Sequence, residues 1–101
     1  MVEYGMVWYG MVSKDIKDIK LEPNFEPSMK TLMRIFKTMT EKGPEGKTIL
    51  SLDTNLQYSR LAKHIVWMEK KGLVESRVEK SKINVGLTEK GRIFASTLSN
   101  D

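Results

Sequence analysis

Between residues 27 and 71, hydrophobic positions recur every three or four residues, which is the spacing of one face of a helix. Pro27 stands where a helix usually begins and Gly43-Pro44 is a typical ending, so the sequence predicts a first helix between them. Its apolar stripe consists of Met29, Leu32, Met33, Phe36 and Met39, flanked by Ile35. We expect this stripe to fill the core rather than to form a binding surface.

Two more helices are predicted before the period changes. Residues 48–53 form a short helix with Ile49 and Leu52 facing inward, and a break of three residues follows it. A longer helix runs from about residue 57 to 71, where Gly72 supplies its C-terminal stop. On the inner face of this longer helix we expect Leu61, Ile65 and Met68.

After Gly72 the hydrophobic period becomes that of strands. Residues 73–79 and 83–87 predict the two strands of a hairpin, with a polar, basic tip at residues 80–82. Thr88 can cap a last helix. The inner face of that helix is expected to carry Leu87, Gly91, Phe94 and Leu98. A glycine inside a helix costs on the order of 1 kcal/mol relative to alanine, so Gly91 indicates close contact with another element.

This order of elements predicts a mainly α fold with a small β-hairpin, the winged helix-turn-helix. Such a domain suits DNA, because a helix fits the major groove and polar side chains near its N-terminus can reach base edges. A hairpin with a basic tip can lie along a neighbouring groove or phosphate ridge. We expect the domain to occupy residues 27–101.

Residues 1–26 are predicted to form a separate N-terminal extension. A near repeat around Trp8 is rich in aromatic and β-branched side chains and favours a strand, and the charged residues after it favour a short helix. Because such a stretch would be sticky if exposed, we expect a packing or dimerisation arm. An alternative is that translation starts at Met6 or Met11.

The charge of the chain is distributed unevenly. The whole sequence carries a net charge of +4, with a pI near 9.4. Residues 1–26 hold three lysines and five acidic residues, a net −2, whereas residues 27–101 hold 14 basic and eight acidic residues, a net +6. A basic domain of this kind is compatible with a polyanionic partner, although the charge alone does not identify one.

The predicted DNA contacts lie on the helix at 57–71 and at the hairpin tip. They are Gln57, Tyr58, Ser59, Arg60, Lys63 and His64 on the helix, and Lys80 and Lys82 on the tip. The alternative for these residues is an ordinary solvated surface. Two of them have a further alternative, since Tyr58 can pack between helices and His64 can make a packing contact.

Between about residues 32 and 98 the chain resembles the small archaeal winged helix-turn-helix regulators that include the ArnR-type proteins. The matching segments are Thr48-Ile49-Leu50, then residues 54–61, 68–74 and 87–91. The resemblance implies a regulator that binds double-stranded DNA as a homodimer. This chain departs from the pattern at Gln57, where such families usually place Ser or Thr. It also lacks their long C-terminal dimerisation helix, so the N-terminal extension is the expected dimer contact.

The composition argues against enzymatic and metal-binding functions. There is no Cys and only one His, and no phosphate-cradling glycine loop or nucleophile–base pair is visible. Asp15 and Asp18 have no second acid–base partner and fit a solvated face. We expect no cofactor and no catalytic activity. Because no secretory signal or spanning segment is present, we expect a cytoplasmic protein without membrane association.

These features predict a sequence-specific double-stranded DNA-binding transcriptional regulator that acts as a homodimer. Two alternatives remain open. The first is a weakly specific architectural protein that binds DNA or RNA through the same basic surface, and the second is a winged helix used only for protein–protein interaction. A winged helix used only for protein–protein interaction would not need the face at residues 57–64 for its activity. A weakly specific architectural protein would use this face but show little preference for one nucleotide sequence.

Overall fold

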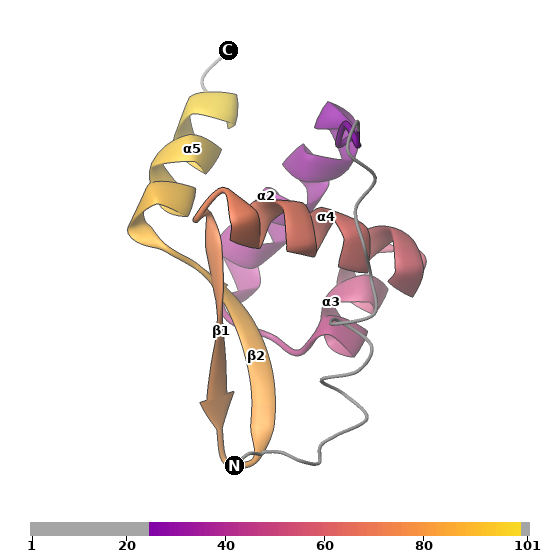
Figure 1. The fold of residues 1–101 in the computed structure, drawn as a ribbon, viewed down its shortest axis with the longest axis vertical. Coiled ribbons are helices and arrows are strands. Elements are labelled where there is room, and N and C mark those ends of the chain that lie inside the picture. Colours follow the sequence, from indigo (N-terminus) through magenta and orange to yellow (C-terminus); the bar gives the residue numbers. More distant parts are fainter. Residues whose placement is uncertain (1–24, 100–101) are drawn as a thin grey trace.

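The computed structural model describes residues 25–99 and shows four helices and one hairpin in that range (Figure 1). In chain order they are α2 (Met29–Lys42), α3 (Lys47–Thr54), α4 (Tyr58–Lys70), β1 (Val74–Glu79), β2 (Lys82–Leu87) and α5 (Glu89–Ser99). The predicted fold class, a winged helix-turn-helix with a small hairpin, is confirmed. The predicted strand and short helix of the N-terminal extension lie outside the described residues.

Helix α2 begins at Met29, two residues after the predicted start at Pro27. Ser28 is the N-cap, and its Oγ accepts a hydrogen bond from the backbone N–H of Thr31. The buried side chains of the helix are Thr31, Leu32, Ile35, Phe36 and Met39. Met29 and Met33 were expected in the core but are 53% and 43% exposed. The predicted stripe was wider than the face that the other elements cover, which is centred on Ile35.

The predicted inner face of α3 was wrong. Ile49 and Leu52 are 50% and 71% exposed, whereas Leu50 and Thr54, one turn apart, are buried. Thr54 enters the core because its hydroxyl donates to the carbonyl oxygen of Leu50 at 2.7 Å, so no polar group is left unsatisfied. Helix α3 has only eight residues, and its apolar residues Ile49, Leu50 and Leu52 point in different directions around the helix axis. The hydrophobic spacing therefore does not determine which of them faces the core.

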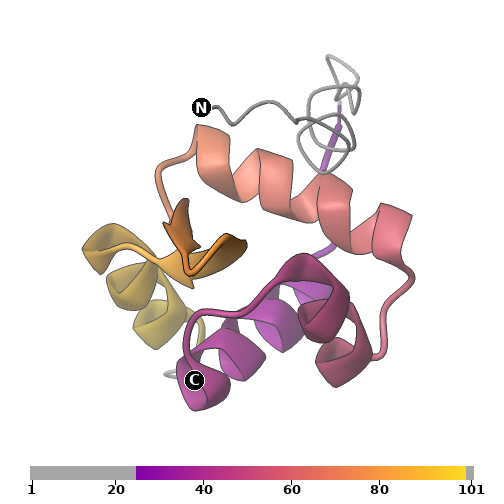
Figure 2. The same ribbon diagram turned by 90° about the horizontal axis from the view of Figure 1, so that it is seen from below.

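The turn between α3 and α4 is fixed by local backbone bonds. Asn55 adopts the left-handed conformation with φ of 59°, and the N–H of Leu56 donates to the carbonyl of Ser51 at 3.0 Å. From α2, Arg34 donates to the carbonyl of Thr54 at 3.4 Å. Beyond the turn, α4 runs along one side of the domain and α2 along the other (Figure 2). The predicted inner residues of α4 are buried between them: Leu61, Ile65 and Met68.

The hairpin, or wing, pairs β1 and β2 antiparallel, from Val74 opposite Leu87 to Glu79 opposite Lys82. Two residues form its turn, Lys80 and Ser81, with φ of 50° and 66°. Positive φ at both positions is what a type I′ hairpin turn requires, so the tip is shorter than predicted and Lys82 already belongs to β2. The loop before α3 adds a bridge to the sheet through backbone bonds between Glu45 and Val85.

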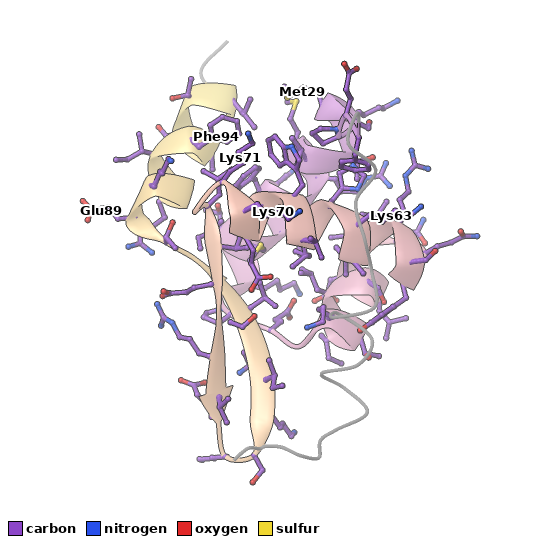
Figure 3. All side chains as sticks on the ribbon, in the orientation of Figure 1. Met29, Lys63, Lys70, Lys71, Glu89 and Phe94 are labelled. Carbon is purple, nitrogen blue, oxygen red and sulfur yellow. The ribbon has the colours of Figure 1, made fainter. Side chains whose placement is uncertain are left out.

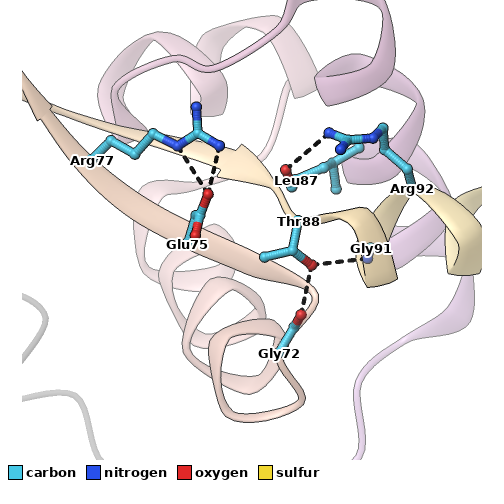
Figure 4. Close-up of polar contacts among 7 residues, drawn as sticks. All are labelled: Gly72, Glu75, Arg77, Leu87, Thr88, Gly91 and Arg92. Carbon is cyan, nitrogen blue, oxygen red and sulfur yellow. Dashed lines mark hydrogen bonds and ion pairs between the residues drawn. The ribbon is translucent and has the colours of Figure 1, made fainter.

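A close contact joins the wing to α5, as the sequence predicted from Gly91. The Thr88 hydroxyl donates to the carbonyl of Gly72 at 2.6 Å and accepts from the N–H of Gly91 at 3.0 Å (Figure 4). A Cβ at Gly91 would lie 1.9 Å from the carbonyl oxygen of Leu73, so only glycine fits there. Arg92 also donates to the carbonyl of Leu87 at 3.3 Å.

Candidate nucleic-acid interface

The outward face of α4 is polar and basic. Its inward side chains are Leu61, Ala62, His64, Ile65 and Met68. Opposite them, Ser59, Arg60 and Lys63 are exposed, and Gln57 is exposed just before the helix. Tyr58 is half-buried. The structure therefore places four of the six predicted helix contacts on one accessible surface near the N-terminus of α4.

The start of α4 carries positive potential that its own sequence does not neutralise. Gln57 occupies the N-cap position but makes no side-chain capping hydrogen bond, and the first turn contains no acidic residue. The first backbone N–H groups of a helix have no partner within the helix, and the helix dipole places partial positive charge there. Together with Arg60 and Lys63, this end of α4 suits a phosphate or another anion.

His64 occupies the interior, which corrects the expectation that it forms part of a contact surface. The residue is 4% exposed, and the Phe25 ring packs edge-on against the imidazole at 5.6 Å between centroids. The Ser28 N–H can only donate, so Nε2 accepts from it at 3.2 Å and Nδ1 carries the proton donated to the Arg60 carbonyl at 2.9 Å. Burial lowers the pKa of His64, which favours this neutral form.

Two exposed lysines that were not among the predicted contacts, Lys70 and Lys71, lie at the C-terminal end of α4. Lys70 is exposed seven residues after Lys63, two helical turns along the same face (Figure 3). Lys71 lies over the ring of the half-buried Trp67, 5.7 Å from its centroid. The helical spacing from Lys63 is sufficient to place Lys70 on the same face of the helix.

The wing tip carries the other predicted contacts. Lys80 and Lys82 are both exposed, and neither forms an ion pair with a carboxylate in the part of the chain that the structure describes. Closer to the domain, Arg77 does pair with Glu75, donating from Nε at 2.9 Å (Figure 4). The basic side chains available to a ligand on the wing are therefore at its far end.

Hydrogen bonds hold the wing in a defined position relative to α4. The Ser76 hydroxyl on β1 donates to the Glu69 carboxylate on α4 at 3.0 Å. At the base of the wing, the Leu73 N–H donates to the Met68 carbonyl at 2.9 Å. These bonds tie the base and the middle of β1 to α4.

Residues 25–99 show no constellation suited to metal binding. No group of three or more His, Cys, Asp or Glu side chains comes together there. Glu45 lies near Asp53, and burial followed by this neighbouring carboxylate raises the pKa of Glu45. Glu45 and Asp53 are only two carboxylates, fewer than the three side chains that such a metal-binding group would need. In the same range, no helix is long and apolar enough to cross a membrane.

Comparison with solved structures finds the same architecture in several other proteins. Sso10a-2, a DNA-binding protein from Sulfolobus solfataricus, superposes with a TM-score of 0.62 at 18% identity, covering 72% of this chain and 75% of that one. The MarR family regulator SPO1453 from Silicibacter pomeroyi gives 0.60 at 18% identity, and the match covers 86% of this chain but only 57% of the regulator. SSV1 F-93 gives 0.61 at 22% identity, covering 78% and 88%.

These identities are low, so the structural likeness establishes the fold and nothing finer. A search of curated protein sequences finds no match. A family model described as winged helix-turn-helix matches residues 28–100, which is most of the chain and includes every element of the structure. The chain therefore belongs to the winged helix-turn-helix family.

Proposed function

We propose that this protein is a sequence-specific double-stranded DNA-binding transcriptional regulator. The observation that carries the proposal is the exposed face of α4, where Ser59, Arg60 and Lys63 follow an N-terminus without a side-chain cap or an acidic residue. A helix with side chains is about 10–12 Å across and fits the major groove, which is about 12 Å wide. Similarity to a DNA-binding protein and a transcriptional regulator supports the same function.

The side chains on this face match the chemistry of base edges and phosphates. Arg60 can donate two hydrogen bonds to guanine O6 and N7, and Gln57 can pair with adenine N6 and N7. Ser59 can bond to several bases, whereas Lys63 suits a phosphate as a compact charge. His64 is left out because its ring nitrogens are already bonded inside the domain. In this proposal, specificity depends chiefly on Gln57 and Arg60.

The wing supplies a second, sequence-independent contact in this proposal. Lys80 and Lys82 stand at the far end of a hairpin whose base is bonded to α4. Each phosphate that they neutralise releases condensed counterions, so their contribution falls as the salt concentration rises. Lys70 extends the basic surface toward the C-terminal end of α4.

The proposal also includes a homodimer acting in the cytoplasm. Two copies related by a twofold axis would place their α4 helices in successive major grooves, about 34–36 Å apart, and read a palindromic site. We also group the chain with the ArnR-type regulators, for which the segment around Thr54-Asn55-Leu56 is the narrowest of the matching segments. Light scattering on the free protein and on its complex with a selected duplex tests the dimer, and a complex with one copy per duplex contradicts it.

Fluorescence anisotropy with a random duplex and with a duplex enriched by selection tests the function. We expect tighter binding to the selected duplex and a steep loss of affinity with salt. Arg60→Glu/Lys63→Glu should abolish binding. The matched control is Lys30→Glu/Lys37→Glu, which changes the charge equally at two exposed positions of α2 and should retain the preference.

The other outcomes identify the alternatives. Equal affinity for selected and random duplexes would indicate a weakly specific architectural protein. Absence of binding at low salt, or loss of binding in both charge-reversal variants alike, would contradict recognition by α4. In the first of these cases a winged helix used only for protein–protein interaction becomes the better account.

A further inference from the structure

Helix α2 exposes an apolar patch that the proposed DNA contact does not use. Met29 and Met33 are 53% and 43% exposed and lie one turn apart on the same face, which we call the methionine face. Lys30, Arg34 and Lys37 border it, and all three are exposed. The start of α2 lies beside α4, because the Ser28 N–H is bonded to His64, and Figure 3 shows Met29 at this end of the helix. Single exposed hydrophobic residues are ordinary, but an adjacent pair on one helix is a candidate contact surface.

The N-terminal extension joins the domain beside this face. Phe25 packs on His64, and the Ser28 N–H is bonded to the same ring, so the chain is anchored directly before α2. Val12 and Phe25 are 13 positions apart in the sequence, and an extended chain spans at most about 43–47 Å over that separation. Helix α2 is only about 21 Å long, so every part of the methionine face lies within reach of residues 1–12.

The chemistry of the extension complements that of the methionine face. Residues 1–12 include Tyr4, Trp8 and Tyr9 and contain a single charged side chain, Glu3. Methionine side chains adapt to irregular surfaces, and a thioether beside an aromatic ring contributes about 0.3–1.5 kcal/mol. Residues 13–26 carry three lysines and four acidic residues, a net −1, which favours the basic border of α2.

From these observations we infer that residues 1–12 dock on the methionine face of their own chain. A segment tethered by a short linker has an effective concentration in the millimolar range, far above the micromolar concentration of a second copy. Mass action therefore favours the chain's own segment over that of a second molecule, so in this inference residues 1–12 are not the dimer contact that the resemblance led us to expect. The other exposed apolar pair, Ile49 and Leu52 on α3, has Asp53 beside it and no exposed basic side chain on its helix.

Tryptophan fluorescence in the absence of DNA tests the docking. Trp67→Phe keeps an aromatic ring at residue 67 and leaves Trp8 as the only tryptophan. We expect Trp8 to emit at shorter wavelength than in a free peptide of residues 1–20, and the shift to persist through a wide dilution series. Met29→Gln/Met33→Gln should move the emission to the peptide position, whereas the control Ile49→Gln/Leu52→Gln should not.

A thermodynamic cycle provides a second measurement that does not depend on fluorescence. In the full chain, Met29→Gln/Met33→Gln should lower the denaturation midpoint, and in a chain starting at Met11 this loss should disappear. Equal losses in both chains, or peptide-like Trp8 emission in the full chain, would overturn the docking. A wavelength shift that vanishes on dilution would also overturn it, because the segment would then occupy a second copy. None of these results affects DNA binding by α4.

Discussion

Helices α2 and α4 are alike in construction but different in what they present to solvent. They contain 14 and 13 residues, each buries one apolar face, and each has basic side chains on the other. On α2 those basic residues border two exposed methionines, whereas around Arg60 and Lys63 on α4 no large hydrophobic side chain is exposed. Because both helices carry exposed basic residues, positive charge alone does not distinguish α4 as the proposed DNA contact. The proposal for α4 rests also on its neighbouring side chains and on an N-terminus that has neither a side-chain cap nor an acidic residue in the first turn.

The largest expected effect tests the similarity of the two inner faces. Ile35 on α2 and Ile65 on α4 are both almost completely buried. We expect Ile35→Ala and Ile65→Ala each to lower the free energy of unfolding by about 2–5 kcal/mol, through lost apolar contact and a residual cavity. Urea denaturation measures both. If only one variant lost much less than about 2 kcal/mol of unfolding free energy, the two helices would not contribute equally to the core.

The second prediction concerns His64, the point where α4 holds the start of α2. Because burial lowers its pKa, the native state favours the neutral ring, and protonation would oppose its bond from the Ser28 N–H. The stabilisation is complete above about pH 6.5 and is lost as the pH falls below it, by at most about 1.4 kcal/mol per pH unit. Urea denaturation across this range should show a weaker pH dependence in His64→Gln. Identical profiles would contradict the arrangement.

The third prediction compares the contribution of the wing lysines to DNA binding with that of the lysines on α2. Lys80→Ala/Lys82→Ala should weaken binding to random and selected duplexes alike and reduce the salt slope by about 1–2, the value for one or two phosphate contacts. Lys30→Ala/Lys37→Ala removes the same charge from α2 and should leave the slope close to that of the unsubstituted chain. Anisotropy over a range of salt concentrations distinguishes them. Equal reductions would indicate a non-specific charge effect.

The smallest effect concerns the two helix starts. Ser28 caps α2 through its hydroxyl, whereas Gln57 leaves α4 without a side-chain cap. Gln57→Ser should therefore raise the free energy of unfolding by about 0.5–1 kcal/mol, and Ser28→Ala should lower it by a similar amount. If the Gln57 amide contacts a base, the same substitution also weakens binding to the selected duplex. A more stable variant with unchanged preference would exclude Gln57 from base recognition.

The sequence was sufficient to predict the order of elements and the fold class. The helix and strand boundaries were close, because Gly43, Gly72 and Thr88 act through local backbone chemistry. Gly91 was also read correctly as a position of close approach. These signals are local, so they can be read without knowing which elements pack together.

The orientation of side chains was harder to predict. Ile49 and Leu50 are adjacent apolar residues, and only the packing of α3 against α2 and α4 determines which one is buried. His64 falls between the polar and apolar faces of α4, and its position inside depends on Phe25 and Ser28, which are far away in sequence. Lys70 was not predicted as a contact, although its helical spacing from Lys63 places it on the same face. The proposed contacts themselves stay predictions.

The most direct test of the central proposal is to follow the backbone amide resonances of the isotope-labelled protein while a selected duplex is added. Recognition by α4 predicts the largest shifts at residues 57–63 and at the wing tip, residues 80–82, with residues 30–37 of α2 almost unchanged. Shifts centred on α2, or spread evenly over every exposed lysine, would contradict the proposal that the exposed face of α4 is the DNA-binding surface.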